Sequence, residues 1–302
     1  MFQILHKTNI DFMGWKNVSF TVSSLLILLG IICLVQIGRG SANLGIDFVG
    51  GTTVQLGFKE RIPIDRARVA LENSGISGAT IQEVGESGNK ILIKLRESEG
   101  TSDKIQTIFR QEFPNNSFEV VSIEEIGPVI GKALQRDALV AITVSIIAII
   151  FYIALRFEFK FGVAAAIATM HDVLAVLGIF YLLNKEINLL IVTALLTLAG
   201  YSLTDTVVVF DRIRENIRRS RREPLVKLIN SSINEVLSRT IITSLTVVLV
   251  LIPLVLFGGE VLHNFSVALL MGVIVGTYSS VFVASPILVV WQSRTGGRLI
   301  SK

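Results

Sequence analysis

The sequence predicts an α-helical polytopic membrane protein with six transmembrane helices and an α+β domain inserted between the first and the second of them. The 302-residue chain is 51% hydrophobic and has a mean hydropathy of +0.65. Charged residues make up only 17% of it, against about 25% in soluble domains. The apolar residues gather in long blocks, whereas residues 39–137 form a polar block long enough to bury a core of its own.

Six apolar blocks have the length of a membrane crossing. We expect the spans Val18–Ile37, Leu139–Leu155, Phe161–Leu183, Leu189–Phe210, Ile241–Phe257 and Phe265–Trp291. At a rise of ~1.5 Å per residue, such blocks cross the ~30 Å of hydrocarbon in a bilayer. The first block precedes Gly40, Ser41 and Ala42, which resemble a signal-peptide cleavage site. The block is longer than a usual signal segment, so we expect a retained anchor.

Basic residues in the connectors predict which side of the membrane each connector faces. The connector after the fourth span is rich in them: Arg212, Arg214, Arg218, Arg219, Arg221, Arg222 and Lys227. The C-terminal tail adds Arg294, Arg298 and Lys302, whereas the connector after the fifth span has no lysine or arginine. The positive-inside rule therefore places both termini in the cytoplasm and the polar block on the outer side of the membrane.

These signals divide the chain into segments. We expect a cytoplasmic N-terminus at 1–17, a first span at 18–38, a periplasmic domain at 39–137, spans two to six at 138–291 with a basic cytoplasmic loop at about 211–238, and a cytoplasmic tail at 292–302. The formal net charge of +4 is explained by orientation and by contact with lipid head groups. We therefore expect no nucleic-acid binding.

The polar block 39–137 has the pattern of a small α+β domain. Alternating apolar residues predict four strands, at Thr52–Phe58, Ala79–Val84, Lys90–Arg96 and Phe118–Ile126. Helical spacing predicts one helix at Ile64–Ser74 and a second that Thr101 or Ser102 caps. The glycines and serine of 85–88 predict a hairpin turn between the middle strands. The order β-α-β-β-α-β is that of a ferredoxin-like domain.

Ionisable residues inside the spans are the candidates for function, because each costs ~2.5–3.5 kcal/mol on insertion scales. Asp205 lies in the fourth span and Arg239 just before the fifth, both near the cytoplasmic side. Their similar depth predicts an ion pair between neighbouring helices. His171 and Asp172 lie near the middle of the third span and form a weaker candidate, because a nearby backbone group or a water would satisfy them equally well.

Asp205 shares a helical face with Tyr201, and Ser202 and Thr204 place hydroxyl groups nearby. A carboxylate at this depth, close to an arginine and to hydroxyls, could take up and release a proton as its partner moves. The alternative is a static buried pair of Asp205 and Arg239 that only fixes helix packing. Both interpretations stay open at this point.

Other polar positions indicate structure rather than chemistry. A solvated, ion-paired helix end at the inner edge of the membrane explains Asp211 and Arg212 at least as well as a supporting role in the proton pathway does. Gly50 and Gly51 are not followed by the Gly-Lys-Ser/Thr of a phosphate loop. With one cysteine and three scattered histidines, we expect no metal site and no cofactor. The spans also offer no nucleophile paired with a base, so an enzyme is the least expected class.

The last span carries a pattern of small residues: Gly272, Gly276, Ser279, Ser280, Ala284 and Ser285. Such residues predict close packing against a neighbouring helix. Pro286 predicts a kink or a break in this span near its cytoplasmic end.

Four segments carry specific motifs: Leu44–Thr52 (LGIDFVGGT), Ala199–Asn216 (AGYSLTDTVVVFDRIREN), Ser238–Leu245 (SRTIITSL) and Gly276–Pro286 (GTYSSVFVASP). Together they resemble the SecD/SecF family of protein-export membrane proteins. The form of the second motif looks like the SecF members of the family rather than the SecD members. The resemblance extends from the first span to the last.

The resemblance implies a role in protein export. SecF-like proteins are accessory subunits of the bacterial Sec translocon, and each pairs with a SecD-like subunit in an assembly that resembles the RND transporter superfamily. The resemblance implies an unfolded preprotein as substrate, the translocon channel as a further partner, and protons as the coupling ion. The proton-motive force would then drive the late, periplasmic-side stage of export, without an ATP site in this chain.

The same resemblance implies roles for individual residues. Asp205 and Arg239 match the proton pathway of the family, which agrees with their choice from depth and charge. His171 and Asp172 lie in a position that recurs in the family. The resemblance also implies that Asp47, with the glycines Gly50 and Gly51, shapes the junction between the first span and the periplasmic domain as a structural or hinge element.

Two other classes of protein remain as alternatives. An RND-type exporter of lipids or drugs shares the architecture, but this chain would supply only half of its usual twelve spans. A passive scaffold of a membrane complex would use Asp205 and Arg239 as a packing pair.

Overall fold

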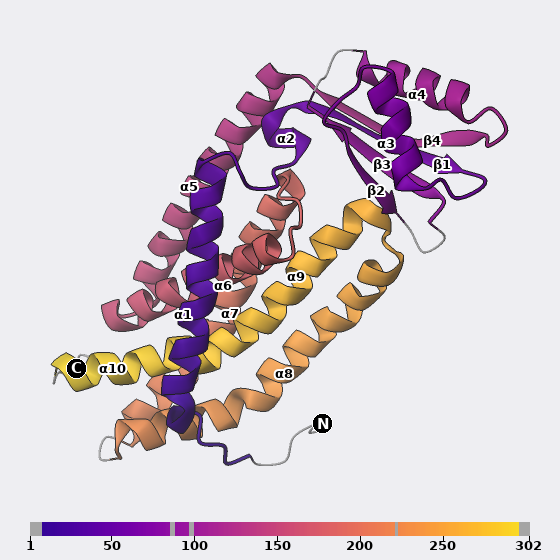
Figure 1. Cartoon of the computed structure of the whole chain (residues 1–302). Coiled ribbons are helices and arrows are strands. Elements are labelled where there is room, and N and C mark those ends of the chain that lie inside the picture. Colours follow the sequence, from indigo (N-terminus) through magenta and orange to yellow (C-terminus); the bar gives the residue numbers. More distant parts are fainter. Residues whose placement is uncertain (1–7, 85–87, 97–99, 221–222, 296–302) are drawn as a thin grey trace. The chain divides into compact units, whose positions relative to one another are not determined.

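Two compact units make up the chain in a computed structural model that describes residues 8–84, 88–96, 100–220 and 223–295. The sheet unit comprises Leu44–Val140 together with the short segment Glu186–Leu189. The helical unit comprises the other described residues. Figure 1 labels the helices and strands of both units.

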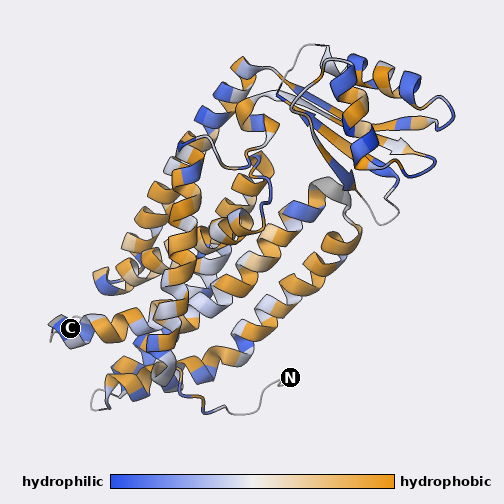
Figure 2. Ribbon diagram, in the orientation of Figure 1, coloured by the Kyte–Doolittle hydropathy of each residue, from blue (hydrophilic) through white to orange (hydrophobic). Residues whose placement is uncertain are grey.

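Among the described residues, six helical stretches are long and apolar enough to cross a membrane. They are η1 with α1 (Met13–Trp15 and Lys16–Gly38), α5 (Pro128–Arg156), α6 (Phe159–Leu182), α7 (Leu189–Arg219), α8 (Leu225–Phe257), and a last stretch of α9 (Gly259–Ser279), η2 (Ser280–Ala284) and α10 (Ser285–Thr295). Hydrophobic residues cover most of α1, α5, α8 and α9 (Figure 2). Each predicted span overlaps one of these stretches, so the six spans are confirmed.

The helices run beyond their apolar blocks. Helix α7 continues to Arg219 and α8 begins at Leu225, so most of the basic loop expected at about 211–238 is helical. Helix α5 begins at Pro128, inside the segment expected to belong wholly to the inserted domain. Hydropathy marks only the part of a helix that lies in lipid, and it therefore underestimates helices with polar ends. Arg221, Arg222, Arg298 and Lys302 lie outside the described residues.

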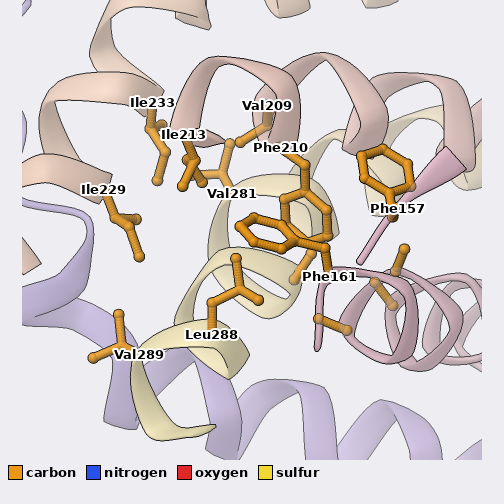
Figure 3. Close-up of a cluster of buried hydrophobic side chains, with 14 of the residues drawn as sticks. Phe157, Phe161, Val209, Phe210, Ile213, Ile229, Ile233, Val281, Leu288 and Val289 are labelled. Atoms are coloured by element: carbon orange, nitrogen blue, oxygen red, sulfur yellow. The ribbon is translucent and has the colours of Figure 1, made fainter. Parts of the chain in front are cut away.

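A buried hydrophobic cluster packs α6, α7, α8 and the last stretch together (Figure 3). Phe161 of α6 and Phe210 of α7 meet edge to face, with ring centroids 5.3 Å apart. Val281 and Leu288 of the last stretch pack around them. Lipid is as apolar as these side chains, so the cluster stabilises the unit by van der Waals packing rather than by removing surface from water.

Helices α1 and α6 approach closely at two glycines. A Cβ atom on Gly30 would lie 2.3 Å from the carbonyl oxygen of Leu174, and one on Gly178 would lie 2.6 Å from the Gly30 nitrogen. Only glycine at both positions allows this contact between backbones, as is typical of small residues in membrane helix interfaces.

The last stretch contains an irregular turn next to Pro286. Ser280–Ala284 form a π-helical turn, and α10 begins directly after it. Pro286 has no N–H group to donate to the carbonyl four residues earlier, which belongs to Phe282. The hydroxyl of Ser19 on α1 lies 2.9 Å from that carbonyl oxygen and 2.8 Å from the carbonyl oxygen of Lys16, so its one hydrogen is shared between the two acceptors. The neighbouring helix thus satisfies a backbone acceptor that the proline leaves free.

Replacing Ser19 with alanine should destabilise the helical unit by about 1–2 kcal/mol, because the part-buried Phe282 carbonyl would lose this donor. Thermal unfolding of the purified chain in detergent measures this loss. The matched control is Thr21→Ala, since the Thr21 hydroxyl is exposed and bonds only within its own helix, to Asn17. Equal melting temperatures for the two variants would contradict the role given to Ser19.

The sheet unit has four antiparallel strands in the order β2-β3-β1-β4, with helices α3 (Ile64–Asn73) and α4 (Thr101–Glu112) packed on one face (Figure 1). The strands are β1 (Gly51–Phe58), β2 (Thr80–Val84), β3 (Lys90–Leu95) and β4 (Phe118–Ile126). Val54 of β1 pairs with Ile93 of β3 and with Ile123 of β4. Val54 and Ile93 are fully buried in the core that the helices cover. The ferredoxin-like order expected from the sequence is confirmed.

The turns of the sheet unit differ in part from expectation. The residue that precedes α4 is Gly100, with φ +64°, and no side chain of the described residues caps the helix, so the prediction that Thr101 or Ser102 caps it is wrong. Both residues instead lie buried in the first turn of α4. The predicted hairpin turn at 85–88 falls largely outside the described residues.

An exposed ion pair joins the sheet unit's loop before α3 to its edge strand β2. The Arg61 guanidinium donates two hydrogen bonds of 2.9 Å to Glu83, and it holds the pKa of that carboxyl below its usual value. Exposed pairs of this kind contribute little to stability.

Candidate functional site

Two carboxylates are buried among the helices of the helical unit. Asp172 of α6 is 0% exposed and Asp205 of α7 is 8% exposed. The two lie close enough to interact electrostatically. Buried carboxylates of this kind need hydrogen-bond donors or a proton, and the surrounding hydroxyl groups supply the donors.

Asp205 is bound by the π-helical turn of the last stretch. The Ser280 hydroxyl lies 2.5 Å from Asp205 Oδ2 and 3.1 Å from the carbonyl oxygen of Thr277. A hydroxyl has one hydrogen and two lone pairs, so Ser280 can serve either state of the carboxyl. It donates to an ionised Asp205, or it accepts from a protonated Asp205 while donating to Thr277. The same geometry therefore accommodates a carboxyl with or without its proton.

Asp172 is bound by its neighbour in sequence and by α7. His171 Nδ1 lies 2.8 Å from Asp172 Oδ1, and the Ser202 hydroxyl donates to Asp172 Oδ2. His171 Nε2 is buried without a hydrogen-bond partner among the described residues. Ser202 lies three residues before Asp205, on the same face of α7. Helix α7 thus bonds to α6 through Ser202 and to the last stretch through Asp205.

A glycine allows this arrangement. A Cβ atom on Gly276 of α9 would lie 3.2 Å from the Cβ atom of Ser202, which is tighter than ordinary contacts. The small residues of the last stretch therefore let it approach α7 where the carboxylates lie. Ser280 is a partner of Asp205 that the sequence did not single out. It belonged to the small-residue pattern, but nothing in that pattern pointed to Asp205.

Arg239 does not form the expected ion pair. Among the described residues, no carboxylate oxygen lies within 4.0 Å of its side-chain nitrogens, although its charge is near enough to act on Asp205. Arg239 is exposed, whereas the next residue of α8, Thr240, is 1% exposed and faces inward. Neighbouring residues on a helix point ~100° apart, so Thr240 takes the inward position that the prediction gave to Arg239.

The other candidates of the fourth span, Tyr201, Ser202 and Thr204, point to different partners. The Tyr201 hydroxyl donates to Ser244 of α8 at 3.3 Å rather than to Asp205. Thr204 is exposed and donates to the carbonyl of Gly200, so the structure does not bring it into the site. Only Ser202 of the predicted hydroxyl groups is part of the buried network.

Asp211 and Arg212 form ion pairs at the polar end of α7. Asp211 pairs with Arg156, the last residue of α5. Arg212 pairs with Glu215 at 2.6 Å and with Glu235 of α8. These contacts agree with an ion-paired helix end and hold α5, α7 and α8 together there.

The predicted junction residues lie in the sheet unit. Gly50 has φ +76° and Gly51 has φ +137°, where other residues are strained. A Cβ atom on Gly51 would also lie 2.2 Å from the carbonyl oxygen of Leu95 in β3. Asp47 lies in the short helix α2 (Ile46–Val49), which precedes these glycines, and accepts a hydrogen bond from the Leu189 amide.

Comparison with known proteins places this arrangement in a family. The family described as "Protein export membrane protein SecD/SecF, C-terminal" matches residues 104–294, more than half of the chain. The "SecD/SecF GG Motif" matches residues 43–60. The chain belongs to the SecD/SecF family. The matched ranges include Asp205, Ser280 and the glycine pair, so the buried carboxylate and the junction both lie within family-specific segments.

Relatives in the SecD/SecF family cover nearly the whole chain. A protein translocase subunit SecF of Thermodesulfovibrio yellowstonii is 51% identical over 95% of this chain and 96% of its own length. A protein translocase subunit SecF of Endomicrobium trichonymphae is 38% identical over 98% of this chain and 96% of its own length.

A solved structure of the SecD/SecF family confirms the fold. The crystal structure of SecDF from Thermus thermophilus, a translocon-associated membrane protein, matches with a TM-score of 0.83 at 36% identity. The match covers 95% of this chain and 39% of the SecDF chain. This chain therefore corresponds to about two fifths of that longer protein.

Proposed function

We propose that the chain is a SecF-type subunit of a bacterial protein translocase, which acts with a SecD-like subunit. Relatives named protein translocase subunit SecF match it along nearly their whole length. The match to part of a SecDF structure, over 39% of that chain, supports a SecD-like subunit as its partner. The pair uses the proton-motive force to drive the late, periplasmic-side stage of preprotein export.

One observation carries the proton-coupled part of the proposal, namely the contact of Asp205 with Ser280 in the π-helical turn. Uptake of a proton by Asp205 removes a buried charge and reverses the direction of the hydrogen bond to Ser280. Release restores both. Because Asp205 and Ser280 lie on different helices, the protonation state changes the attraction between those helices. Arg239 belongs to this proposed pathway as a nearby positive charge, without an ion pair to Asp205.

The placement of the chain follows from the same proposal. The six apolar stretches cross the inner membrane with both termini in the cytoplasm and the sheet unit in the periplasm. Partners are the SecD-like subunit, the translocon channel, an unfolded preprotein and the surrounding lipids. Protons are the coupling ion, and the chain works as transport machinery rather than as an enzyme.

The test is pulse-chase export of a secreted preprotein in cells with and without the chain. Appearance of the mature protein outside the inner membrane should slow several-fold without the chain. Dissipating the proton gradient should remove most of the difference between the two strains. Normal export combined with altered drug resistance would instead support the RND-type exporter, which no observation here favours.

A further inference from the structure

The segment that opens the sheet unit binds the connector between α6 and α7. The Gly45 amide donates to the carbonyl oxygen of Ile187 at 2.9 Å, and Leu44 forms a parallel bridge with Ile187. A Cβ atom on Gly45 would lie 2.7 Å from Glu186 Oε1 and 2.8 Å from the Cβ atom of Asn188. Gly45, the first glycine of the LGIDFVGGT motif, therefore permits a close backbone contact with this connector.

Asp47 binds the first residue of α7. Its Oδ2 atom accepts a hydrogen bond of 2.9 Å from the Leu189 amide, at the start of that helix. The first amides of a helix have no partner within it, and the helix dipole favours a negative charge there. Asp47 supplies both an acceptor and a charge. It does so from 142 residues earlier in the sequence, unlike an ordinary capping residue.

An ion pair adds a third contact to the same connector. Lys94 of β3 pairs with Glu186, and the two side chains are only 24% and 16% exposed. The pair of Arg61 and Glu83 differs in its cation, because the Arg61 side chain is 68% exposed. By its contacts, the connector Glu186–Leu189 belongs to the sheet unit, although it leads directly into α7.

We propose that Asp47, together with the pair of Lys94 and Glu186, is a positioning element that fixes the start of α7 to the sheet unit. Because α7 is a continuous helix, a displacement of its first residue is carried along it to Asp205, sixteen residues further on. The link therefore couples movement of the periplasmic domain to the buried carboxylate. This inference rests on the proposed function for its consequence, but not for the link itself.

Hydrogen exchange tests the link without any transport assay. In the full-length chain with its SecD-like partner, in nanodiscs, Asp47→Ala should speed exchange of the amides at 189–192 about fivefold to tenfold, the effect of losing a helix cap. Asp47→Asn keeps an acceptor, so its exchange should stay within about threefold of wild type. Unchanged exchange in Asp47→Ala would overturn the link, whatever export does.

Swapping the charges of Lys94 and Glu186 tests whether movement of the sheet unit reaches Asp205 through α7. This test does not depend on the folding of the Asp47 variants. Lys94→Glu and Glu186→Lys should each slow preprotein export several-fold, and the double variant should recover most of the loss. The matched controls are Arg61→Glu, Glu83→Arg and their double variant, which should export like wild type. Normal export in the Lys94→Glu and Glu186→Lys single variants, or no recovery in the double variant, would overturn the transmission. Normal export in Asp205→Asn would refute the proton-coupled function. The hydrogen-exchange evidence for the contact of Asp47 with α7 would remain valid.

Discussion

The substitution Asp205→Asn should reduce preprotein export to the level of cells that lack the chain. The asparagine side chain would keep the shape of the native one and a hydrogen bond to Ser280, so folding stability should change by no more than about 1 kcal/mol. It cannot take up or release a proton, which removes the change in charge between α7 and the last stretch. Pulse-chase export at matched membrane levels of the two proteins measures the effect.

The matched control is Thr204→Ala on the neighbouring residue of α7, whose hydroxyl is exposed and bonds within its own helix. It should export like wild type. Normal export by Asp205→Asn would show that Asp205 is a packing group, and the scaffold interpretation would then replace the proton-coupled one.

The substitution Gly30→Ala should prevent α1 and α6 from packing as they do in the native protein. The added methyl group would lie 2.3 Å from the Leu174 carbonyl oxygen, and a backbone atom cannot move aside as a flexible side chain would. We expect a loss of about 2–3 kcal/mol and a lower level of protein in the membrane. Thermal unfolding in detergent and quantitation of the membrane-inserted chain measure both effects.

Gly38→Ala is the control for this substitution, because Gly38 lies on the same helix and a Cβ atom there meets nothing within 4 Å. Its stability should match or slightly exceed that of wild type, since alanine favours the helical state. A similar loss in both variants would mean that general helix effects, rather than the contact with α6, determine the result.

Much of the fold could be predicted from the sequence, because strand alternation, helical spacing and long apolar blocks are all local patterns. The alternation in Phe118–Ile126 predicted a strand with the observed bounds, and the apolar block that ends at Phe257 predicted the end of α8. The start of α8 at Leu225 was missed because its first turns mix apolar with polar residues and form no continuous apolar block. Whether a polar segment continues a helix depends on neighbours such as Arg212, which pairs with Glu235 from another helix.

The site was predictable in part. Asp205 was chosen because an ionisable side chain is costly to insert into a membrane, and its burial in the structure agrees with that choice. Its partner was not predictable from charge and depth, because one residue of offset on α8 turns Thr240 inward and Arg239 outward. The contacts to Ser280 and from Asp47 to Leu189 join residues 75 and 142 positions apart. Such pairs depend on tertiary packing, which no local pattern in a single sequence records.

The π-helical turn Ser280–Ala284 also determines the direction in which the side chains of the following helix, α10, point. A turn of this kind holds one residue more than an α-helical turn, and each residue rotates an α-helix by ~100°. Leu288 and Val289 face the buried cluster only because that extra residue is present. Deleting one residue here would restore a regular helix and turn both side chains away from the cluster. In evolution, this stretch should therefore accept substitutions more readily than any change in its length.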